Sequence, residues 1–122
     1  MLLDTYAWVE FFRGTAKGVT VQNVLEDNSC FTSAISLAEL SEWIEREQLD
    51  RDWILKSVKK LSAIIPLDIE TLELSGVLKV QKRKELKGIG LIDCIILAVS
   101  KRYQLKVVTG DSHFKDENAL LL

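Results

Sequence analysis

The stretch that decides the fold is "GLIDCIILAVSKRYQLKVVTGDSHF", residues 90–114. Residues 91–100 are nearly all apolar, and Lys101 and Arg102 follow them. This pattern predicts a helix over 91–103 in the centre of the core. The next segment, "LKVVTG" at 105–110, predicts a strand that breaks at a glycine, and Asp111 follows at once. Helix followed by buried strand is the pattern of a parallel α/β sheet, and it places an acid where that strand ends.

The same alternation continues through the rest of the chain. Short apolar segments predict strands at residues 1–3, 29–35 and 64–68, and the terminal "ALLL" predicts an edge strand at 119–122. Helical spacing of apolar residues predicts helices at 4–14, 15–28, 36–49, 50–64 and 68–86. No linker or repeat divides the chain, so we expect one domain over residues 1–122. Its predicted fold is a three-layer α/β/α sandwich with a central, mainly parallel sheet.

Composition excludes several classes of protein. The 122 residues are 48% hydrophobic and 28% charged, which excludes a disordered or fibrous chain and allows one sizeable core. The N-terminus lacks the basic segment of a signal peptide, and no apolar run reaches membrane-spanning length, so we expect a cytoplasmic protein with no membrane partner. Cys30 and Cys94 lie in apolar stretches without metal-ligand spacing, and we expect two buried free thiols.

Four acids lie at or near the predicted carboxyl ends of strands. Asp4 ends the first strand and Asp111 follows a late one. Glu39 lies in the first turns of the helix after the second strand, and Asp93 begins the apolar helix. Ligand sites in open parallel sheets gather at this edge, so the four side chains are expected to converge.

Each acid also has a purely structural explanation. Asp4 suits the N-cap of the first helix, and Asp111 suits an Asx turn. Glu39 fits a capping box, "SLAE", in which Ser36 is the cap. Asp93 is harder to explain in this way, because an acid within "GLIDCIILAV" is costly to bury unless it is an N-cap, is paired or binds a metal.

Taken as a set, the acids predict a divalent-cation site. Clustered carboxylates repel one another, a cation relieves that repulsion, and oxygen ligands favour Mg²⁺ or Mn²⁺. Such cations generate a hydroxide nucleophile and stabilise phosphoryl displacement. The chain has a single histidine, His113, which excludes a ribonuclease that uses two histidines as acid and base. His113 itself is interpreted as a turn residue.

Four blocks, "LLDTYAWVEFFRG", "TSAISLAEL", "GLIDCIILAVS" and "VVTGDSHF", resemble in order and spacing the motifs of PIN-domain ribonucleases, and most closely the VapC-like toxins of prokaryotic toxin–antitoxin pairs. The resemblance covers essentially the whole chain and implies a PIN fold and metal-dependent cleavage of RNA. It implies that Asp4, Glu39, Asp93 and Asp111 are the catalytic residues and hold Mg²⁺ or Mn²⁺. Secondary positions are Thr5, Thr109 and Ser112, with Glu42 as the alternative to Glu39 and Asp116 as the alternative to Asp111.

The resemblance also implies partners: an RNA substrate, a second copy of the chain in a homodimer, and a small VapB-like antitoxin whose peptide covers the site. The apolar residues Trp8, Phe11, Phe12 and Trp43 are candidates for dimer or antitoxin contacts. An equally good interpretation of these four is plain core.

A basic run, "KVQKRKELK" at 79–87, contains the candidate RNA-binding residues Lys79, Lys82, Arg83, Lys84 and Lys87. The formal net charge of the chain is −2, so an RNA partner requires a local basic patch. The alternative is a solvated helix face. Phosphate contacts from such a patch carry no sequence information.

Other enzyme classes fit less well. A phosphatase of the haloacid-dehalogenase type needs a second Asp where Tyr6 stands, and a receiver domain needs a neighbouring acid pair after its first strand. No glycine-rich phosphate loop is present, since "KGIG" lacks the following Lys-Ser/Thr. Two alternatives stay within the PIN fold: a nuclease of RNA processing without an antitoxin, and a non-catalytic RNA- or protein-binding module.

Overall fold

The sheet in the computed structural model, which describes residues 1–122, has five short parallel strands in the order β3-β2-β1-β4-β5. The strands are β1 (Leu2–Leu3), β2 (Phe31–Ser33), β3 (Ala63–Ile65), β4 (Val107–Thr109) and β5 (Ala119–Leu121). The chain moves outward from β1 to β2 and β3, and then returns to the other side of β1 as β4 and β5. The strand order therefore reverses between β1 and β4, where open α/β sheets bind ligands at the carboxyl ends.

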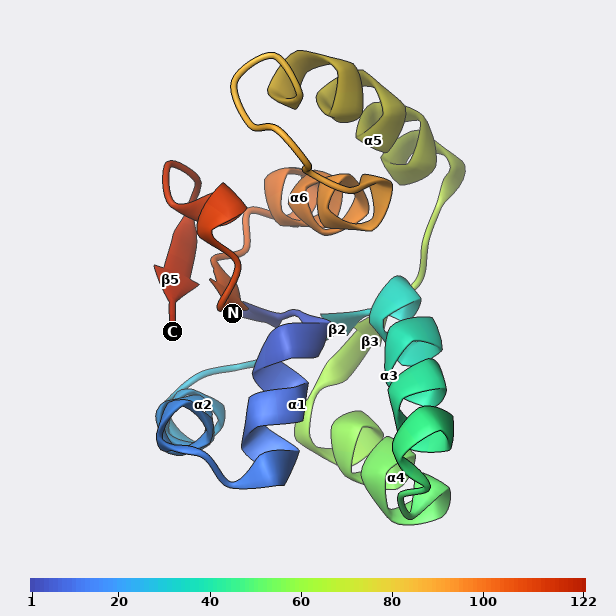
Figure 1. Cartoon of the computed structure of the whole chain (residues 1–122), viewed down its shortest axis with the longest axis vertical. Helices are drawn as coiled ribbons and strands as arrows, with labels where there is room; N and C mark the ends of the chain where they lie inside the picture. Colours follow the sequence, from blue (N-terminus) through green and yellow to red (C-terminus); the bar gives the residue numbers. More distant parts are fainter.

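Helices cover both faces of this sheet (Figure 1). The helices α1 (Thr5–Arg13), α2 (Ala16–Asp27), α3 (Ala34–Glu47) and α4 (Arg51–Leu61) lie on one side. The helices α5 (Ile69–Lys82) and α6 (Leu91–Tyr103) lie on the other, with α6 between the sheet and α5. A short 3₁₀ helix, η1 (Ser112–Phe114), follows β4. The predicted three-layer sandwich and the terminal edge strand are both confirmed. None of the helices combines the length and the hydrophobicity of a membrane-spanning segment.

Two hydrophobic cores lie on opposite faces of the sheet because successive strand residues point to opposite sides. Leu3 and Val108 pack against the layer of α1–α4, whereas Leu2 and Val107 pack against α6. Strands buried on both faces must be continuously apolar, which explains "LL" and "VV". Both cysteines are free and buried, as predicted.

Element boundaries differ from the prediction at three places. Helix α4 ends at Leu61, before its predicted end at residue 64, because Ala63–Ile65 pairs with β2 as strand β3. Strand β2 ends at Ser33, so α3 starts earlier than expected. Helix α5 stops at Lys82, and turns at 83–88 bring Leu86 and Ile89 into the core around α6.

Candidate metal centre

All four predicted acids line a single cavity of about 460 Å³ at the carboxyl ends of β1 and β4. Its lining residues are Asp4, Thr5, Tyr6, Glu39, Asp93, Ile96, Gly110 and Asp111. The acids come from four separate segments, and the sheet reversal between β1 and β4 brings the first and last of them together.

Asp4 is the most deeply buried acid, with 9% of its surface exposed. It is the predicted N-cap of α1, since its Oδ1 accepts a hydrogen bond from the Ala7 amide at 2.9 Å. Burial raises its pKa from 3.8 to about 7, and the negative charges of Asp93 and Glu39 add to this rise, although hydrogen bonds from Thr109 and Ala7 oppose it. A carboxyl group with this pKa carries a proton about half of the time at pH 7 unless a cation compensates its charge.

Asp93 lies in the first turn of α6, but the N-cap is Gly90. Asp93 is therefore not the N-cap, as the sequence had suggested, but lies three residues after it. Its Oδ2 accepts a hydrogen bond from the Gly90 amide at 3.2 Å. Burial raises the pKa of Asp93, and the neighbouring charge of Asp111 contributes to the rise. The bond to Gly90 uses Oδ2 and leaves Oδ1 without a hydrogen bond.

Asp111 shapes its turn as the sequence predicted. Its Oδ1 accepts a hydrogen bond from the His113 amide at 2.9 Å and so starts η1. The hydroxyl of Thr109 accepts a hydrogen bond from the Asp111 amide at 3.0 Å, which fixes the backbone where β4 ends. Thr109, which also hydrogen-bonds Asp4, is fully buried and thus connects two of the acids.

Glu39 lies inside α3, and the predicted capping box is wrong. Helix α3 begins at Ala34, so Ser36 is within the helix, and the N-cap residue is Ser33. The hydroxyl of Thr5 instead donates a hydrogen bond to Glu39 Oε1 at 2.6 Å. This bond connects the start of α1 to α3 and holds the glutamate at the cavity wall.

The three remaining secondary candidates do not line the cavity of the four acids. Glu42 is exposed and forms an ion pair with Arg46 at 2.5 Å. Asp116 and Ser112 are also exposed. The cavity therefore contains Glu39 and Asp111, and their two predicted alternatives, Glu42 and Asp116, lie outside it.

Sequence reasoning missed two other features of the cavity wall, Tyr6 and Gly110. A Cβ atom at position 110 would lie 2.1 Å from a ring carbon of Tyr6, so only glycine allows this ring to pack against the end of β4. The Tyr6 hydroxyl accepts a hydrogen bond from Lys17 Nζ at 2.9 Å. The glycine between Thr109 and Asp111 was the available signal, because an isolated glycine at a strand end often marks close approach.

The donor set fits a hard divalent cation. Asp4, Asp93 and Asp111 each use one oxygen in a local backbone hydrogen bond. Ligand atoms of Asp93, Asp111 and His113 lie within 4.8 Å of one another. The raised pKa values of Asp4 and Asp93 show that the carboxylates are electrostatically unfavourable without a compensating charge.

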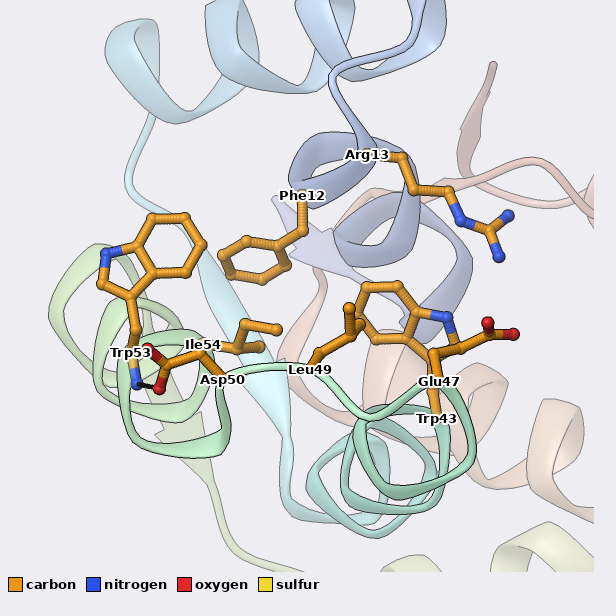
Figure 2. A pocket seen from close by; sticks show the side chains of 8 residues that line it. All are labelled: Phe12, Arg13, Trp43, Glu47, Leu49, Asp50, Trp53 and Ile54. Atoms are coloured by element: carbon orange, nitrogen blue, oxygen red, sulfur yellow. Dashed lines mark hydrogen bonds between the residues drawn. The ribbon is translucent and has the colours of Figure 1, made fainter.

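A second hollow, lined mainly by apolar side chains, lies at the other end of α1 (Figure 2). Its volume is about 370 Å³, and its walls are Phe12, Arg13, Trp43, Glu47, Leu49, Asp50, Trp53 and Ile54. A shallow depression shares Arg13 and Trp43 with this hollow, and shares Thr5, Tyr6 and Glu39 with the acidic cavity. We call the hollow and this depression together the apolar groove; the hollow is its apolar part, and the depression that extends to the acids is lined largely by polar residues such as Glu10, Glu42 and Arg46.

The four aromatic candidates separate into core and surface. Trp8 is fully buried, so it is a core residue and not a partner contact. Trp43 is 5% exposed and presents one side to the apolar groove. Phe11 and Phe12 are half-buried, and the Phe12 ring packs edge-on against Trp53, with centroids 5.5 Å apart.

The basic run is divided between internal contacts and free cations. Lys82 pairs with Glu117 at 2.5 Å, and the Lys79 ammonium group donates a hydrogen bond to the Ile89 carbonyl. The other three, Arg83, Lys84 and Lys87, are exposed in the turns after α5 and form no ion pair. The carbonyl of Lys87 lies 3.0 Å from the His113 ring, which places this turn beside the acids.

Comparison with known proteins gives a family and a set of similar folds. The family model described as "PIN domain" matches residues 1–118. No curated protein matches the chain.

A toxin–antitoxin complex from Klebsiella pneumoniae has a chain that is 20% identical, with a TM-score of 0.78 over 98% of this chain and 94% of that chain. VapBC2 from Rickettsia felis, solved with a DNA fragment from its promoter, is 21% identical, with a TM-score of 0.76 and coverages of 99% and 96%. VapC20 from Mycobacterium tuberculosis, a toxin that cleaves the sarcin–ricin loop, is 17% identical, with a TM-score of 0.75 and coverages of 99% and 97%.

Proposed function

Because the chain belongs to the PIN domain family, we propose that it is a metal-dependent endoribonuclease that acts as the toxin of a VapBC-like toxin–antitoxin pair. The observation that carries this proposal is the convergence of Asp4, Glu39, Asp93 and Asp111 in one cavity where the strand order reverses. An acid with a pKa raised to about 7, as in Asp4, is typical of a functional site and is unfavourable for stability.

In this proposal the four acids hold Mg²⁺ or Mn²⁺. A cation held there would supply activation of water near neutral pH and stabilisation of charge on the scissile phosphate. The protein keeps the acids in place: Asp4 and Asp93 are fixed by the first turns of α1 and α6, and Thr5 orients Glu39. The substrate is cellular RNA, which places the protein in the cytoplasm.

RNA reaches the cavity past the exposed basic turn. Arg83, Lys84 and Lys87 have no acidic partner, so their charges are available to phosphates. Lys79 and Lys82 already contact Ile89 and Glu117, so we assign them to holding the turn and not to binding RNA.

The antitoxin occupies the apolar groove. Trp53, 59% exposed, stands against Phe12 at the wall of the hollow, and such aromatic side chains are the usual anchors of peptide interfaces. Because the groove shares Thr5, Tyr6 and Glu39 with the acidic cavity, one peptide segment can fill the groove and cover the site. The Klebsiella pneumoniae complex and VapBC2 are similar toxin–antitoxin assemblies.

A homodimer would form through the outer side of α5. Ile69 is 74% exposed, and Leu72, Val77 and Val80 are also exposed on the side opposite the buried residues of this helix. Helix α5 lies at the outside of the molecule (Figure 1), and an exposed apolar helix face is typical of a subunit interface. Sedimentation of Ile69→Glu beside the unaltered protein tests this, and an unchanged mass would contradict it.

The two alternatives within the PIN fold make different predictions. A non-catalytic binding module would not lose RNA affinity when the acids are neutralised, and would not cut RNA with any metal. A nuclease of RNA processing would cut RNA but would lack a small partner protein encoded by an adjacent gene. The exposed apolar hollow beside the site favours the toxin, because it offers a surface on which a partner protein can bind.

The deciding experiment measures cleavage of labelled single-stranded RNA by purified, antitoxin-free protein. EDTA, Mg²⁺ and Mn²⁺ are compared, with Asp93→Asn as the inactive variant and the exposed Asp116→Asn as the matched control. We expect cutting only with metal, its loss in Asp93→Asn, and full activity in Asp116→Asn. Asp111→Asn should fold normally and weaken cleavage less than Asp4→Asn. Absence of cutting with every metal and RNA would contradict the proposal.

A further inference from the structure

The single histidine of the chain is held in one orientation beside the acids. Its Nε2 lies 3.0 Å from the carbonyl oxygen of Lys87. A carbonyl only accepts hydrogen bonds, so Nε2 carries the proton, and in a neutral ring Nδ1 then has a free lone pair.

That free nitrogen faces Asp111. His113 Nδ1 is 2.8 Å from Asp111 Oδ1, which is an ion-pair contact if the ring carries a second proton; in the neutral ring, the buried Nδ1 has no hydrogen-bond partner. Two acceptor atoms at this distance repel each other unless a positive charge lies between them or beside both. Either a second proton on the ring or a metal ion would supply that charge.

We propose that His113 Nδ1 is a direct ligand of the divalent cation held by Asp93 and Asp111. This inference rests on the proposed function, because it concerns the same metal centre. Candidate ligand atoms of the three residues lie within 4.8 Å of one another. Adjacent ligands of an octahedral ion, with bonds of about 2.0–2.1 Å, are about 2.9 Å apart, which matches the separation of Nδ1 and Oδ1.

The other ring nitrogen supports the same assignment. Histidines that bind metals generally donate their second N–H to a carbonyl or carboxylate, which fixes the tautomer and the ring plane. The Lys87 carbonyl does this for His113, and the turn that carries it also presents the free cations Arg83 and Lys84. Cation binding would therefore also fix the basic turn that meets the RNA.

A nitrogen ligand changes which cation the centre prefers. Oxygen ligands alone suit Mg²⁺, whereas imidazole suits transition metals, and Mn²⁺ accepts both kinds of donor. With His113 in the ligand set, the protein binds Mn²⁺ more tightly than Mg²⁺. The imidazole accounts for this difference in affinity.

Pulsed EPR of Mn²⁺ bound to tag-free protein tests the contact directly. Since the chain has one histidine, labelling with ¹⁵N-histidine must replace any ¹⁴N coupling from His113 by a ¹⁵N coupling. We expect that replacement. Bound Mn²⁺ without histidine coupling would overturn the inference and leave the metal centre of the proposed function intact, and His113 would then be a charged partner of Asp111. Failure to bind Mn²⁺ at all would overturn both.

Calorimetric titration provides an independent measurement. His113→Ala should lower Mn²⁺ affinity by about 10–100-fold and Mg²⁺ affinity by less, so the preference for Mn²⁺ falls. Lys115→Ala, an exposed position in the same turn, is the matched control and should change neither affinity. His113→Gln keeps an N–H for the Lys87 carbonyl and replaces the alanine variant if that protein does not fold. An unchanged Mn²⁺/Mg²⁺ ratio in a folded variant would overturn the inference.

Discussion

Replacing Asp4 with asparagine should stabilise the metal-free protein at pH 8 while abolishing its cleavage of RNA. Asparagine is as good an N-cap as aspartate, so the hydrogen bond from Ala7 is kept. The amide is neutral, so the variant does not bury a charge beside Asp93 and Glu39. A change that increases stability and removes activity identifies a residue kept for function.

The magnitude follows from the pKa of Asp4, which is 3.8 for the free side chain and about 7 in the folded protein. The folded state then binds a proton more tightly than the unfolded chain, so the free energy of unfolding falls as pH rises from 4 to 7. At 1.36 kcal/mol per pKa unit, the loss is at most about 4 kcal/mol above pH 7. For a domain of this size, that corresponds to at most about 15 °C in Tm.

The assay is urea and thermal denaturation in EDTA from pH 4.5 to 8.5. The difference in stability between Asp4→Asn and the unaltered protein should be smallest near pH 4.5 and grow up to pH 8. Asp116→Asn, at an exposed position, should parallel the unaltered protein at every pH. Saturating Mn²⁺ should raise the free energy of unfolding of the unaltered protein and should not change that of Asp4→Asn. Parallel profiles for Asp4→Asn and the unaltered protein would contradict this prediction, because Asp4 would then have an ordinary pKa.

The remaining predictions concern cleavage, RNA binding and the partner. Glu39→Gln should reduce cleavage about 100-fold, whereas Glu42→Gln, one turn along α3 and paired with Arg46, should cut RNA normally in the same assay. Tyr6→Ala should weaken RNA binding about tenfold by removing an exposed ring at the cavity wall, and Tyr6→Phe should not; equal losses would show that the ring is not a stacking surface. Lys87→Ala should lower the slope of log affinity against log salt by about 1, and an unaltered slope would exclude it as a phosphate contact. Trp53→Ala should weaken antitoxin binding at least tenfold by calorimetry without altering cleavage, and undiminished binding would place the antitoxin elsewhere.

Much of this architecture could be predicted from local patterns. Short apolar runs such as "LL" and "VV" between helical segments favour strands buried on both faces, and the run at 91–103 is long enough to indicate a helix. The convergence of Asp4 and Asp111 also followed from the pattern, because parallel strands end at one edge of the sheet.

What could not be predicted depends on contacts between segments. Whether Glu39 caps a helix depends on where β2 ends, and the β2 register is set by pairing with β1 and β3. His113 was interpreted as a turn residue, because nothing in the sequence places the Lys87 carbonyl beside its ring. The packing of Tyr6 on Gly110 depends in the same way on the pairing of β1 with β4.

Anomalous diffraction near the manganese absorption edge, from crystals grown with saturating Mn²⁺, tests most directly whether the four acids bind a metal. We expect a peak inside the cavity lined by Asp4, Glu39, Asp93 and Asp111, within bonding distance of at least two of their carboxylates. The same crystals of Asp93→Asn should lack that peak. A cavity without manganese in the unaltered protein, or a peak only at surface acids, would contradict the claim that these residues form a metal centre.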